Sequence, residues 1–434
     1  MSTYSQALTK IEGHDLFLRL NPEVPDFTSP QKSAKLIIQG GGLKVSLPLL
    51  TDSEELLREF SSFPYQFSEN SLIVGWDIKP LYSYFRGITG SNLNFGPIWD
   101  LRIIERFMGF DNSPPATIKE AKERLVKMIA LPSWDTFQPI YEQVYQPLIK
   151  EVIPAMETNP LADTSKKEHV YPYYELEGQV NGRMKSYRAF SENYVPHTMD
   201  KGIKERLRPI GYDDVFMYFD FCNMEVSVLQ WLSGDPALGQ ILKSGDDAYE
   251  GIWQRITGLK PDKYSRKRAK KIFLPAIFGM GSATLSERLK TDKKTAATLL
   301  DRLYKAFPTA FSWVKGQFLE DGYGIDCFGR RRQFEQGNEY KNRNFVIQAP
   351  ASTICLAKLV KLYENIKNLA KLAFHLHDGF CIIVHKTNVK KLHDLGTSIL
   401  ESSDKLYPNL KLTTACEVGV CLNELTKEIN AVNR

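Results

Sequence analysis

The sequence lacks the features that would assign it at once to several classes of protein. No apolar run approaches the ~18–20 residues that a membrane span needs, and Met1–Gln6 carries no apolar signal core. The six cysteines lie scattered in the second half, without Cys-x-x-Cys or Cys/His metal spacing. Internal repeats and low-complexity segments are also missing. We therefore expect no membrane partner, no disulfide framework and no zinc module, and we expect reduced thiols in a cytoplasmic-type compartment.

Charge and composition indicate a folded protein of more than one domain. The formal net charge is +5 and the pI about 8.6, which permits a polyanionic partner without demanding one. A chain of 434 residues with 43% hydrophobic and 12% aromatic residues is too long for one compact core. Two or three domains are predicted.

A first candidate carboxylate follows a predicted buried strand. Val215–Phe219 is a run of large apolar residues that ends on Asp220. Apolar residues then recur at helical spacing from Met224 until Ser233-Gly-Asp-Pro breaks the pattern. An aspartate at a strand–helix junction can hold a metal ion, and the alternative is that Asp220 only caps the helix.

A second carboxylate has a similar setting. Phe374–Val384 reads as two apolar strands joined through His-Asp-Gly, and an Asp-Gly turn is a strong hairpin signal. The alternative is that Asp378 serves the turn alone. Two aspartates at strand ends are, however, what two-metal phosphoryl transfer requires, because carboxylates bridge divalent ions about 3.5–4 Å apart.

A basic helix is predicted between the two carboxylates. In Arg266–Met280, four residues at i, i+4, i+8 and i+12 form one stripe, which contains Arg266, Lys270, Leu274 and Phe278. Two cations followed by a ring suit a triphosphate whose base stacks near the ring. A solvated helix face is the alternative.

Together these stretches resemble motifs A, B and C of the family A DNA polymerases. The three motifs correspond to Asp220–Ser227, to Arg266–Gly279 and to His377–Gly379. Four further segments resemble the T-x-T-G-R segment, the F-G-R-R-R turn, the N-x-x-x-Q helix and the V-E-V-G-V strand of that family. They are Glu177–Arg183, Phe328–Arg332, Asn344–Gln348 and Cys416–Val420. The resemblance covers roughly residues 175–434.

The resemblance implies an α+β multidomain fold of the right-hand polymerase type, with α/β parts. Residues 1–115 would form a degenerate, RNase H-like exonuclease domain and residues 116–180 a reduced helical thumb. Residues 181–434 would form palm and fingers, with the fingers at about 236–335. The implied activity is DNA-directed DNA synthesis without proofreading, in the cytoplasm of a bacterium or of a phage-infected cell.

The resemblance also implies roles for individual residues. Two Mg²⁺ ions, for which Mn²⁺ could substitute, would be held by Asp220, Asp378 and the carbonyl of Phe221, with Lys270 as general acid. Contacts to the incoming dNTP would come from Arg266, Lys270, Leu274, Phe278, Glu225 and Tyr249. Contacts to primer-template DNA would come from Arg183, Asn344, Gln348, His377, Gly279, Arg330 and Arg331. Glu225 would exclude ribonucleotides by blocking the 2′-hydroxyl.

The N-terminal part reads as a small α/β unit, and the resemblance implies that it is a nuclease fold without a nuclease site. Strands are predicted at 15–20, 35–39, 43–50 and 72–77, with helices at 53–61 and from 97–101. The first strand has no Asp-x-Glu pair, so two cations cannot be held there. Asp77 and Asp100 are interpreted as solvated surface carboxylates. Helices are predicted at 117–129 and 134–156, leaving little room for a thumb, so we expect low processivity without a helper protein.

Three departures from the family pattern concern the site. Leu274 replaces an aromatic residue, Pro275 should kink the helix, and Gly379 replaces the glutamate of motif C. Two alternative functions stay open. A single-subunit RNA polymerase shares the palm, and Glu225 weighs against it. A catalytically silent DNA-binding protein has no physical reason to keep both aspartates and both cations.

Overall fold

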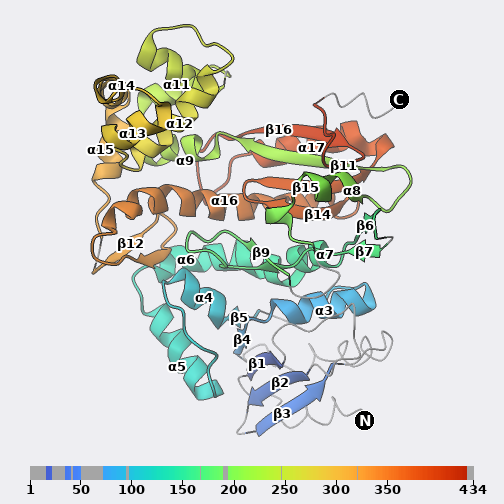
Figure 1. Ribbon diagram of the computed structural model, residues 1–434. Helices are drawn as coiled ribbons and strands as arrows, with labels where there is room; N and C mark the ends of the chain where they lie inside the picture. The colour runs from blue at the N-terminus through green and yellow to red at the C-terminus, as the bar shows by residue number, and fades with distance from the viewer. Residues whose placement is uncertain are drawn as a thin grey trace. The chain divides into compact units, whose positions relative to one another are not determined.

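The computed structural model describes residues 16–21, 35–40, 43–49, 72–93, 97–166, 168–188, 194–245, 247–319 and 321–427. They belong to two compact units (Figure 1). Unit 1 comprises residues 1–220, 355–399 and 415–434, and unit 2 comprises residues 221–354 and 400–414. The predicted boundaries near residues 115 and 180 both fall inside unit 1.

A five-stranded sheet begins unit 1. Its order is β3-β2-β1-β4-β5, with bounds Leu43–Pro48, Lys35–Gly40, Leu16–Asn21, Ile73–Trp76 and Trp99–Asp100. The pairs β1–β2 and β2–β3 are antiparallel, whereas β4 runs parallel to β1 and to β5. The predicted strands are confirmed, and the predicted helix at 53–61 lies outside the described residues. Residues 99–100 form a strand, so the next helix begins only at Leu101.

Asp100 is a buried structural residue, so its interpretation as a solvated carboxylate is wrong. It is 0% exposed and caps α4 (Leu101–Phe107) by accepting hydrogen bonds from the backbone N–H groups of Arg102 and Ile103. It also accepts one from Ile78 at 2.7 Å. Burial and the Asp77 carboxylate raise its pKa to about 6. Asp77 itself pairs with Arg102.

Helices follow in unit 1, and a buried ion pair joins two of them. They are α3 (Lys79–Thr89), α5 (Ile118–Ile129) and a continuous run made of α6 (Trp134–Ile140), η2 (Tyr141–Tyr145), η3 (Leu148–Val152) and α7 (Ile153–Glu157). Glu157 at the end of this run is fully buried. It accepts from Lys79 Nζ at 2.6 Å, from Ser83 Oγ at 2.5 Å and from the N–H of Tyr174 at 2.8 Å. Both predicted helices of this region are confirmed.

A four-stranded sheet carries the two candidate aspartates. Its order is β14-β15-β11-β16, with bounds Lys371–Leu376, Gly379–His385, Asp214–Cys222 and Thr413–Gly419. β15 is antiparallel to both β14 and β11. Helix α17 (Val389–Glu401) lies next to this sheet in Figure 1, and a Cβ placed on Gly396 would lie 2.5 Å from the Phe219 ring. The close approach of α17 therefore constrains the face of β11 that carries Phe219.

Short elements complete unit 1. They are β6 (Leu161–Asp163), β7 (Glu168–Val170), β8 (Tyr174–Glu175), β9 (Lys185–Ser186), η4 (Pro196–Thr198), α8 (Lys201–Arg206), β10 (Leu207–Arg208) and η6 (Lys386–Asn388). β10, β6 and β7 form one small sheet, and β8 and β9 form another.

Helix α16 (Asn342–Ile366) corrects the expectation that no stretch approaches a membrane span. By length and composition it is apolar enough to cross a membrane, with a mean hydropathy of 1.4 over an 18-residue window. However, 89% of that window is buried inside the protein. Burial within the protein accounts for its apolar composition.

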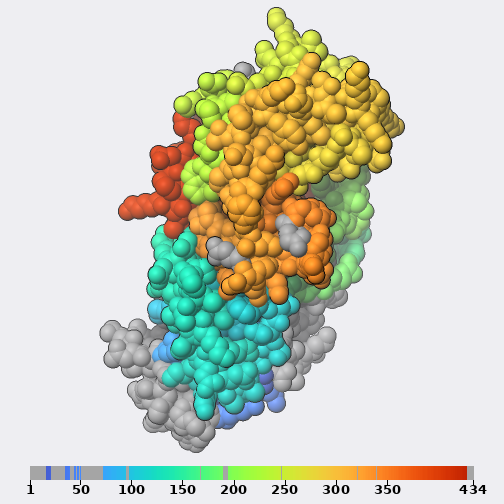
Figure 2. Space-filling model, turned by 90° about the vertical axis from the view of Figure 1, so that its left-hand side faces the viewer, coloured from blue at the N-terminus to red at the C-terminus, as the bar shows by residue number. Residues whose placement is uncertain are grey.

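Unit 2 is mainly helical. Its helices are α9 (Met224–Ser233), α10 (Pro236–Lys243), α11 (Ala248–Thr257), α12 (Ser265–Ile277), α13 (Ser282–Leu289), α14 (Lys293–Ala306) and α15 (Pro308–Lys315), with β12 (Tyr323–Ile325), β13 (Arg331–Gln333) and η5 (Glu339–Lys341). Figure 2 shows residues of α14 and α15, in yellow to orange, at the surface of this unit. Asp235, 0% exposed, caps α10 and accepts a hydrogen bond from the N–H of Ala310 at 3.0 Å, which ties α10 to α15.

Candidate active site

The strand register brings the two candidate aspartates together. Asp220 on β11 lies directly opposite Gly379, the first residue of β15. Directly opposed residues of antiparallel strands have Cα atoms about 4.5–5.5 Å apart. Asp378 immediately precedes Gly379 in the two-residue turn that links β14 to β15. Two residues 158 positions apart in the chain thus share one end of one sheet.

Asp220 is not a helix cap. It lies within β11, which continues to Cys222, and the residue preceding α9 is Asn223 in the left-handed region at φ 56°. The capping alternative is therefore wrong. The hairpin at Asp378 is confirmed, with His377 and Asp378 as its turn and Gly379 already paired in the strand.

Burial alternates along β11 and separates its two faces at the site. Phe219 and Phe221 are 0% and 3% exposed, whereas Tyr218, Asp220 and Cys222 are half-buried. This alternation has the period of two that a strand imposes. Burial, followed by the charges of Asp220 and Asp378, raises the pKa of Tyr218. Both carboxylates therefore act on one neighbouring hydroxyl.

Tyr218 occupies the space beside Gly379. A Cβ built on Gly379 would overlap the Tyr218 hydroxyl and would lie 2.5 Å from its Cζ atom. Real Cβ atoms essentially never approach another heavy atom that closely. The glutamate of the motif C pattern therefore has no room here while Tyr218 keeps this position. The sequence pattern indicated only the missing glutamate, and the tyrosine was missed.

Three histidines and an arginine lie near the turn. The rings of His197 and His377 have centroids 4.7 Å apart, and those of His197 and His375 are 6.3 Å apart. Burial, with neighbouring histidines and Arg183, lowers the pKa of His197 to about 4 and that of His375 to about 3. Burial and Arg183 lower the pKa of His377 as well, against the charge of Asp378. These shifts favour the neutral form of all three rings at pH 7.

Two of these histidines were missed by the sequence reasoning, although both contact the framework of the site. His375 is 2% exposed, and Cys355 Sγ lies 3.7 Å from its Nε2 atom. The Tyr174 hydroxyl donates to the His375 carbonyl at 3.0 Å and accepts from its N–H at 2.9 Å. Ser186 Oγ lies 2.7 Å from His197 Nδ1. The placement of His375 in an apolar strand, two residues before His377, was the only available signal.

The donor set at the aspartates fits magnesium. Mg²⁺ prefers hard oxygen ligands, and it is usually held by one or two carboxylates while keeping waters and substrate phosphates. Asp220 and Asp378 supply such oxygens. Across the described residues, no group of three or more His, Cys, Asp or Glu side chains is arranged to hold a metal ion. The pair therefore suits an ion that is completed by substrate, rather than a closed structural site.

Unit 2 holds the predicted cationic helix. Arg266 and Lys270 are exposed on α12, whereas Leu274 is buried, and Phe278 follows the last helical residue. Helix α12 runs through Pro275 and ends two residues later. The predicted kink at this proline stays a prediction.

Tyr249 and Asp247 lie behind these cations. The Arg266 guanidinium is 5.8 Å and the Lys270 ammonium 6.0 Å from the centroid of the Tyr249 ring. Arg266 Nε donates to Asp247 Oδ2 at 2.7 Å, and Asp247 also caps α11. Tyr249 is only 3% exposed, so the contact it was expected to make with a nucleotide is not available in this conformation. It supports the cations instead.

Three other predicted residues of unit 2 lie at α16 and α9. Gln348 Nε2 donates to Glu225 Oε1 at 2.7 Å, so the predicted sugar-selecting carboxylate is tied to a predicted DNA contact. Asn344 lies one turn before Gln348 on α16, as predicted. Gly279 has φ 99°, and a Cβ there would lie 2.8 Å from the guanidinium of Arg343.

The structure contradicts a DNA contact through the Arg330 side chain. That side chain is 1% exposed, lies 3.9 Å from Asp326 and donates to Thr353 Oγ1 at 3.3 Å. The family resemblance assigned DNA contacts to Arg330 and Arg331, whereas Arg330 is a core residue. Arg331 is half-buried, with its guanidinium 4.3 Å from the centroid of the Tyr323 ring.

Comparisons with known proteins indicate the family of the chain. Three relatives are bacterial polymerases. DNA polymerase I, thermostable, of Thermus filiformis is 28% identical over 218 residues, which is 46% of this chain and 26% of the relative. The Thermus thermophilus enzyme of the same name is 23% identical over 339 residues, 73% of this chain and 40% of the relative. DNA polymerase I of Helicobacter pylori is 24% identical over 364 residues, 75% of this chain and 40% of the relative.

A family profile matches most of the chain, including both candidate aspartates. The profile of DNA polymerase family A matches residues 120–424, well over half of the sequence. The chain belongs to DNA polymerase family A. It spans less than half the length of these curated relatives.

Proposed function

We propose that this protein is a DNA-directed DNA polymerase that adds dNTPs to the 3′ end of a primer on a DNA template. One observation carries the proposal: Asp220 lies opposite Gly379, so that Asp378 and Asp220 meet at one end of an antiparallel sheet. Membership of family A supports the same reaction and the same substrates.

The two aspartates would hold two Mg²⁺ ions, together with the carbonyl of Phe221. When bound, such ions make the attacking 3′-oxygen a better nucleophile and neutralise charge on the leaving pyrophosphate. The chain's own contribution would be to fix both carboxylates at one end of one sheet, Asp220 on β11 and Asp378 in the turn before β15. Phe219, buried against α17, and His375, whose backbone N–H and carbonyl both bond to the Tyr174 hydroxyl, would keep that sheet end in place.

The cationic helix would bind the triphosphate. Arg266 can keep Asp247 on Nε and offer its two terminal nitrogens to phosphate oxygens, because a guanidinium carries five donors. Lys270, exposed on the same stripe, would donate a proton to the pyrophosphate as it leaves. That both act on the nucleotide held at the aspartates follows from the family resemblance.

Glu225 would select deoxyribonucleotides. Its carboxylate is held by Gln348, and a positioned carboxylate can reject a 2′-hydroxyl by its bulk. Arg183, Asn344, Gln348 and His377 would contact the primer-template duplex. Arg and amide side chains can read minor-groove acceptors that every base pair presents, so these contacts would not depend on sequence.

The N-terminal part would be an exonuclease-like remnant without proofreading activity. Its strand order is β3-β2-β1-β4-β5, and the described residues of β1 carry no acidic side chain. We further propose that residues 116–180 serve as a reduced thumb and that residues 236–335 form the fingers. A thumb this short would give weak grip on duplex DNA, so processive synthesis would need a helper protein.

Primer extension with purified variants tests the proposed function. Wild type should extend a primer with dNTPs and Mg²⁺, and Asp378→Ala should lose at least about 10³-fold in rate, since it removes a ligand of both ions. Asp394→Ala is the matched control, because this aspartate is exposed on α17 in the same unit.

The outcomes separate the alternative functions. Extension by wild type that Asp378→Ala abolishes and Asp394→Ala keeps supports the proposal. Extension with NTPs in preference to dNTPs would indicate an RNA polymerase. Binding of primer-template without extension, under Mg²⁺ or Mn²⁺, would indicate a silent DNA-binding protein.

A further inference from the structure

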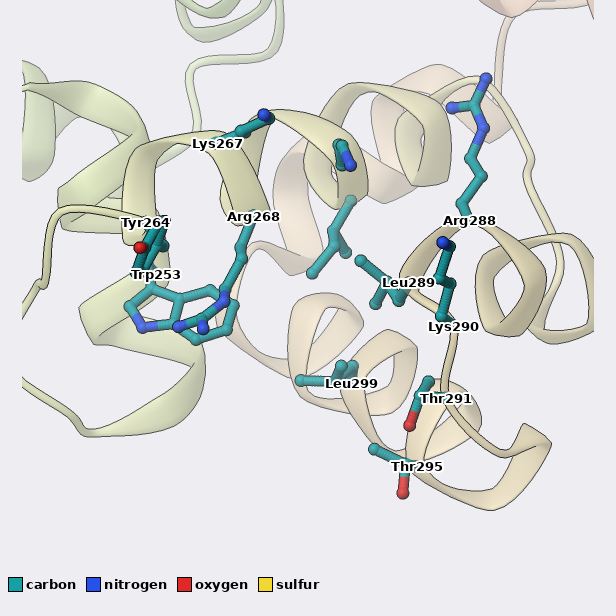
Figure 3. Close-up of a pocket in the computed structure, with 12 residues that line it drawn as sticks. Trp253, Tyr264, Lys267, Arg268, Arg288, Leu289, Lys290, Thr291, Thr295 and Leu299 are labelled. Carbon is teal, nitrogen blue, oxygen red and sulfur yellow. The ribbon is translucent and has the colours of Figure 1, made fainter.

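A basic pocket of about 490 Å³ lies in unit 2. Four helices line it: Trp253 comes from α11, Lys267, Arg268 and Lys271 from α12, Arg288 from α13, and Thr295 and Leu299 from α14. Figure 3 shows Trp253 and Arg268 on one side, Arg288 and Lys290 on the other, and Leu289 and Leu299 between them. Its volume falls in the range of about 300–1,000 Å³ that is typical of small-molecule sites.

The charge of this pocket has one sign. Among the described residues that line it, five are cationic and none is acidic; the cations are Lys267, Arg268, Lys271, Arg288 and Lys290. Arg268 pairs with Asp262 at 3.2 Å, and both side chains are about half exposed. Five cations gathered around one concavity repel one another, and an anion placed among them would relieve that repulsion.

Aromatic and apolar side chains accompany these cations. The Arg268 guanidinium is 5.5 Å from the centroid of the Trp253 ring and 5.7 Å from that of Tyr264, which is 51% exposed. Leu289 and Leu299 add apolar surface between the two charged sides. Phosphate ions alone would not need that surface, whereas an unpaired base stacks on aromatic rings and guanidinium planes.

The pocket is distinct from the predicted triphosphate stripe. With about 100° per residue, Arg268 points about 160° away from Arg266 and Lys270 around α12, Lys271 about 100–140° and Lys267 about 60–100°. The pocket cations therefore lie on a different side of the helix from the stripe, with Lys267 nearest to it. Lys267, Arg268 and Lys271, the basic residues of α12 outside the stripe, all line the pocket.

We propose that this pocket binds one nucleotide unit, with its phosphate among the lysines and arginines and its base against the Trp253 and Tyr264 side. The unit belongs to single-stranded nucleic acid or is a free nucleotide, since both present the same chemistry. The proposal does not depend on polymerase activity, because binding needs neither Asp220 nor Asp378.

Fluorescence anisotropy with a labelled single-stranded dT16 tests the proposal in the full-length protein without Mg²⁺. The pocket variant is Lys267→Ala/Lys271→Ala. The control variant is Lys294→Ala/Lys305→Ala, which removes the same charge from exposed positions of α14. The Kd for dT16 should rise at least about 10-fold in the pocket variant and less than about 2-fold in the control. The slope of log K against log salt should fall by about 1, as about 0.7 is expected per phosphate contact.

Competition identifies the source of the nucleotide. Unlabelled dATP that displaces dT16 at micromolar concentration, more strongly than inorganic triphosphate, indicates a free nucleotide. Displacement by unlabelled dT16 alone indicates a nucleic acid strand. A blunt duplex should lose less affinity than dT16 in Trp253→Leu, because its bases are not free to stack. Equal dT16 affinity in the pocket and control variants, with melting temperatures unchanged, would overturn the proposal.

Discussion

At the scale of single residues, Tyr218 and Gly379 act as a matched pair. The tyrosine fills the volume that any side chain at position 379 would need, on the half-buried face that also carries Asp220. The missing motif C glutamate is therefore not an isolated loss. The large side chain of Tyr218 requires a glycine at position 379, because the two positions share one space.

This pair gives a prediction for an exchange of size. Gly379→Glu should lose at least about 10-fold in primer extension and about 1–3 kcal/mol in the free energy of unfolding, because the new side chain overlaps the Tyr218 ring. Tyr218→Ala/Gly379→Glu should regain most of the stability. Urea unfolding and Mn²⁺ binding by the variants check it. If the double variant is no more stable than Gly379→Glu, the two residues are not coupled in this way.

His375 gives a prediction for the effect of pH on stability. Its pKa in the folded protein is lowered to about 3, so the unfolded chain binds the extra proton first as the pH falls. Stability is therefore lost below the unfolded pKa of about 6.5, by about 2 kcal/mol between about pH 7.5 and about pH 5. Urea unfolding at both pH values, with wild type and His375→Phe, measures the difference. An identical pH dependence in the two proteins would contradict the burial of a neutral ring.

Glu225 and Gln348 give a prediction for sugar selection. Glu225→Ala should raise the incorporation of ribonucleotides relative to deoxyribonucleotides at least about 10-fold, because a side chain that clashes with the 2′-hydroxyl is removed. Gln348→Ala should change selection in the same direction by less, since it only frees the carboxylate it holds. Competition assays with dNTP and NTP mixtures measure the ratio. Unchanged selection in Glu225→Ala would remove this role from the residue.

At the scale of elements, close packing constrains both faces of β11. Asp220 lies on its half-buried face, and Phe219 lies on the opposite face against α17. Gly396 lets α17 approach Phe219, whose neighbour in sequence is Asp220. A side chain there must push either the helix or the ring. The placement of the first aspartate therefore depends on a glycine in a different element.

Gly396→Val should destabilise unit 1 by about 1–3 kcal/mol and lower activity at the same time. Ser398→Val, at an exposed position of the same helix, controls for the cost of valine in a helix. Gly396→Val should have a lower melting temperature and slower primer extension than Ser398→Val. Equal stability of Gly396→Val and Ser398→Val would show that a side chain fits between α17 and Phe219 without cost, which would contradict the prediction.

Elements were predictable where their periodicity was simple. Alternating or continuous apolar runs located β11, β14 and β15, and the two-residue turn fixed the register of β14 against β15. The register that joins Asp220 to Asp378 pairs β11 with β15, which are far apart in the chain, and no local pattern fixes it. Spacing could not distinguish a buried polar side chain from a solvated one. Asp100 and Arg330 were therefore misplaced, since both are charged residues held inside by partners distant in sequence or around a turn.

At the scale of the whole molecule, the chain divides its predicted chemistry between two compact units. Unit 1 contains Asp220, Asp378 and the histidines, and unit 2 contains Arg266, Lys270 and Glu225. The resemblance predicted fingers at about 236–335, which would contain Arg266 and Lys270, but it grouped Glu225 with the aspartates in the palm. Contacts between residues far apart in the chain, such as Lys79 with Glu157, decide which segments form one unit, and no local pattern reveals them.

We propose that Asp220 and Asp378 act together in catalysis, and a double-mutant cycle on primer extension tests this most directly. Asp220→Ala and Asp378→Ala should each reduce kcat by at least about 10³-fold, and the double variant should be hardly slower than either, because residues that act as a unit are strongly non-additive. Losses that simply multiply, or activity that survives in either single variant, would contradict the account.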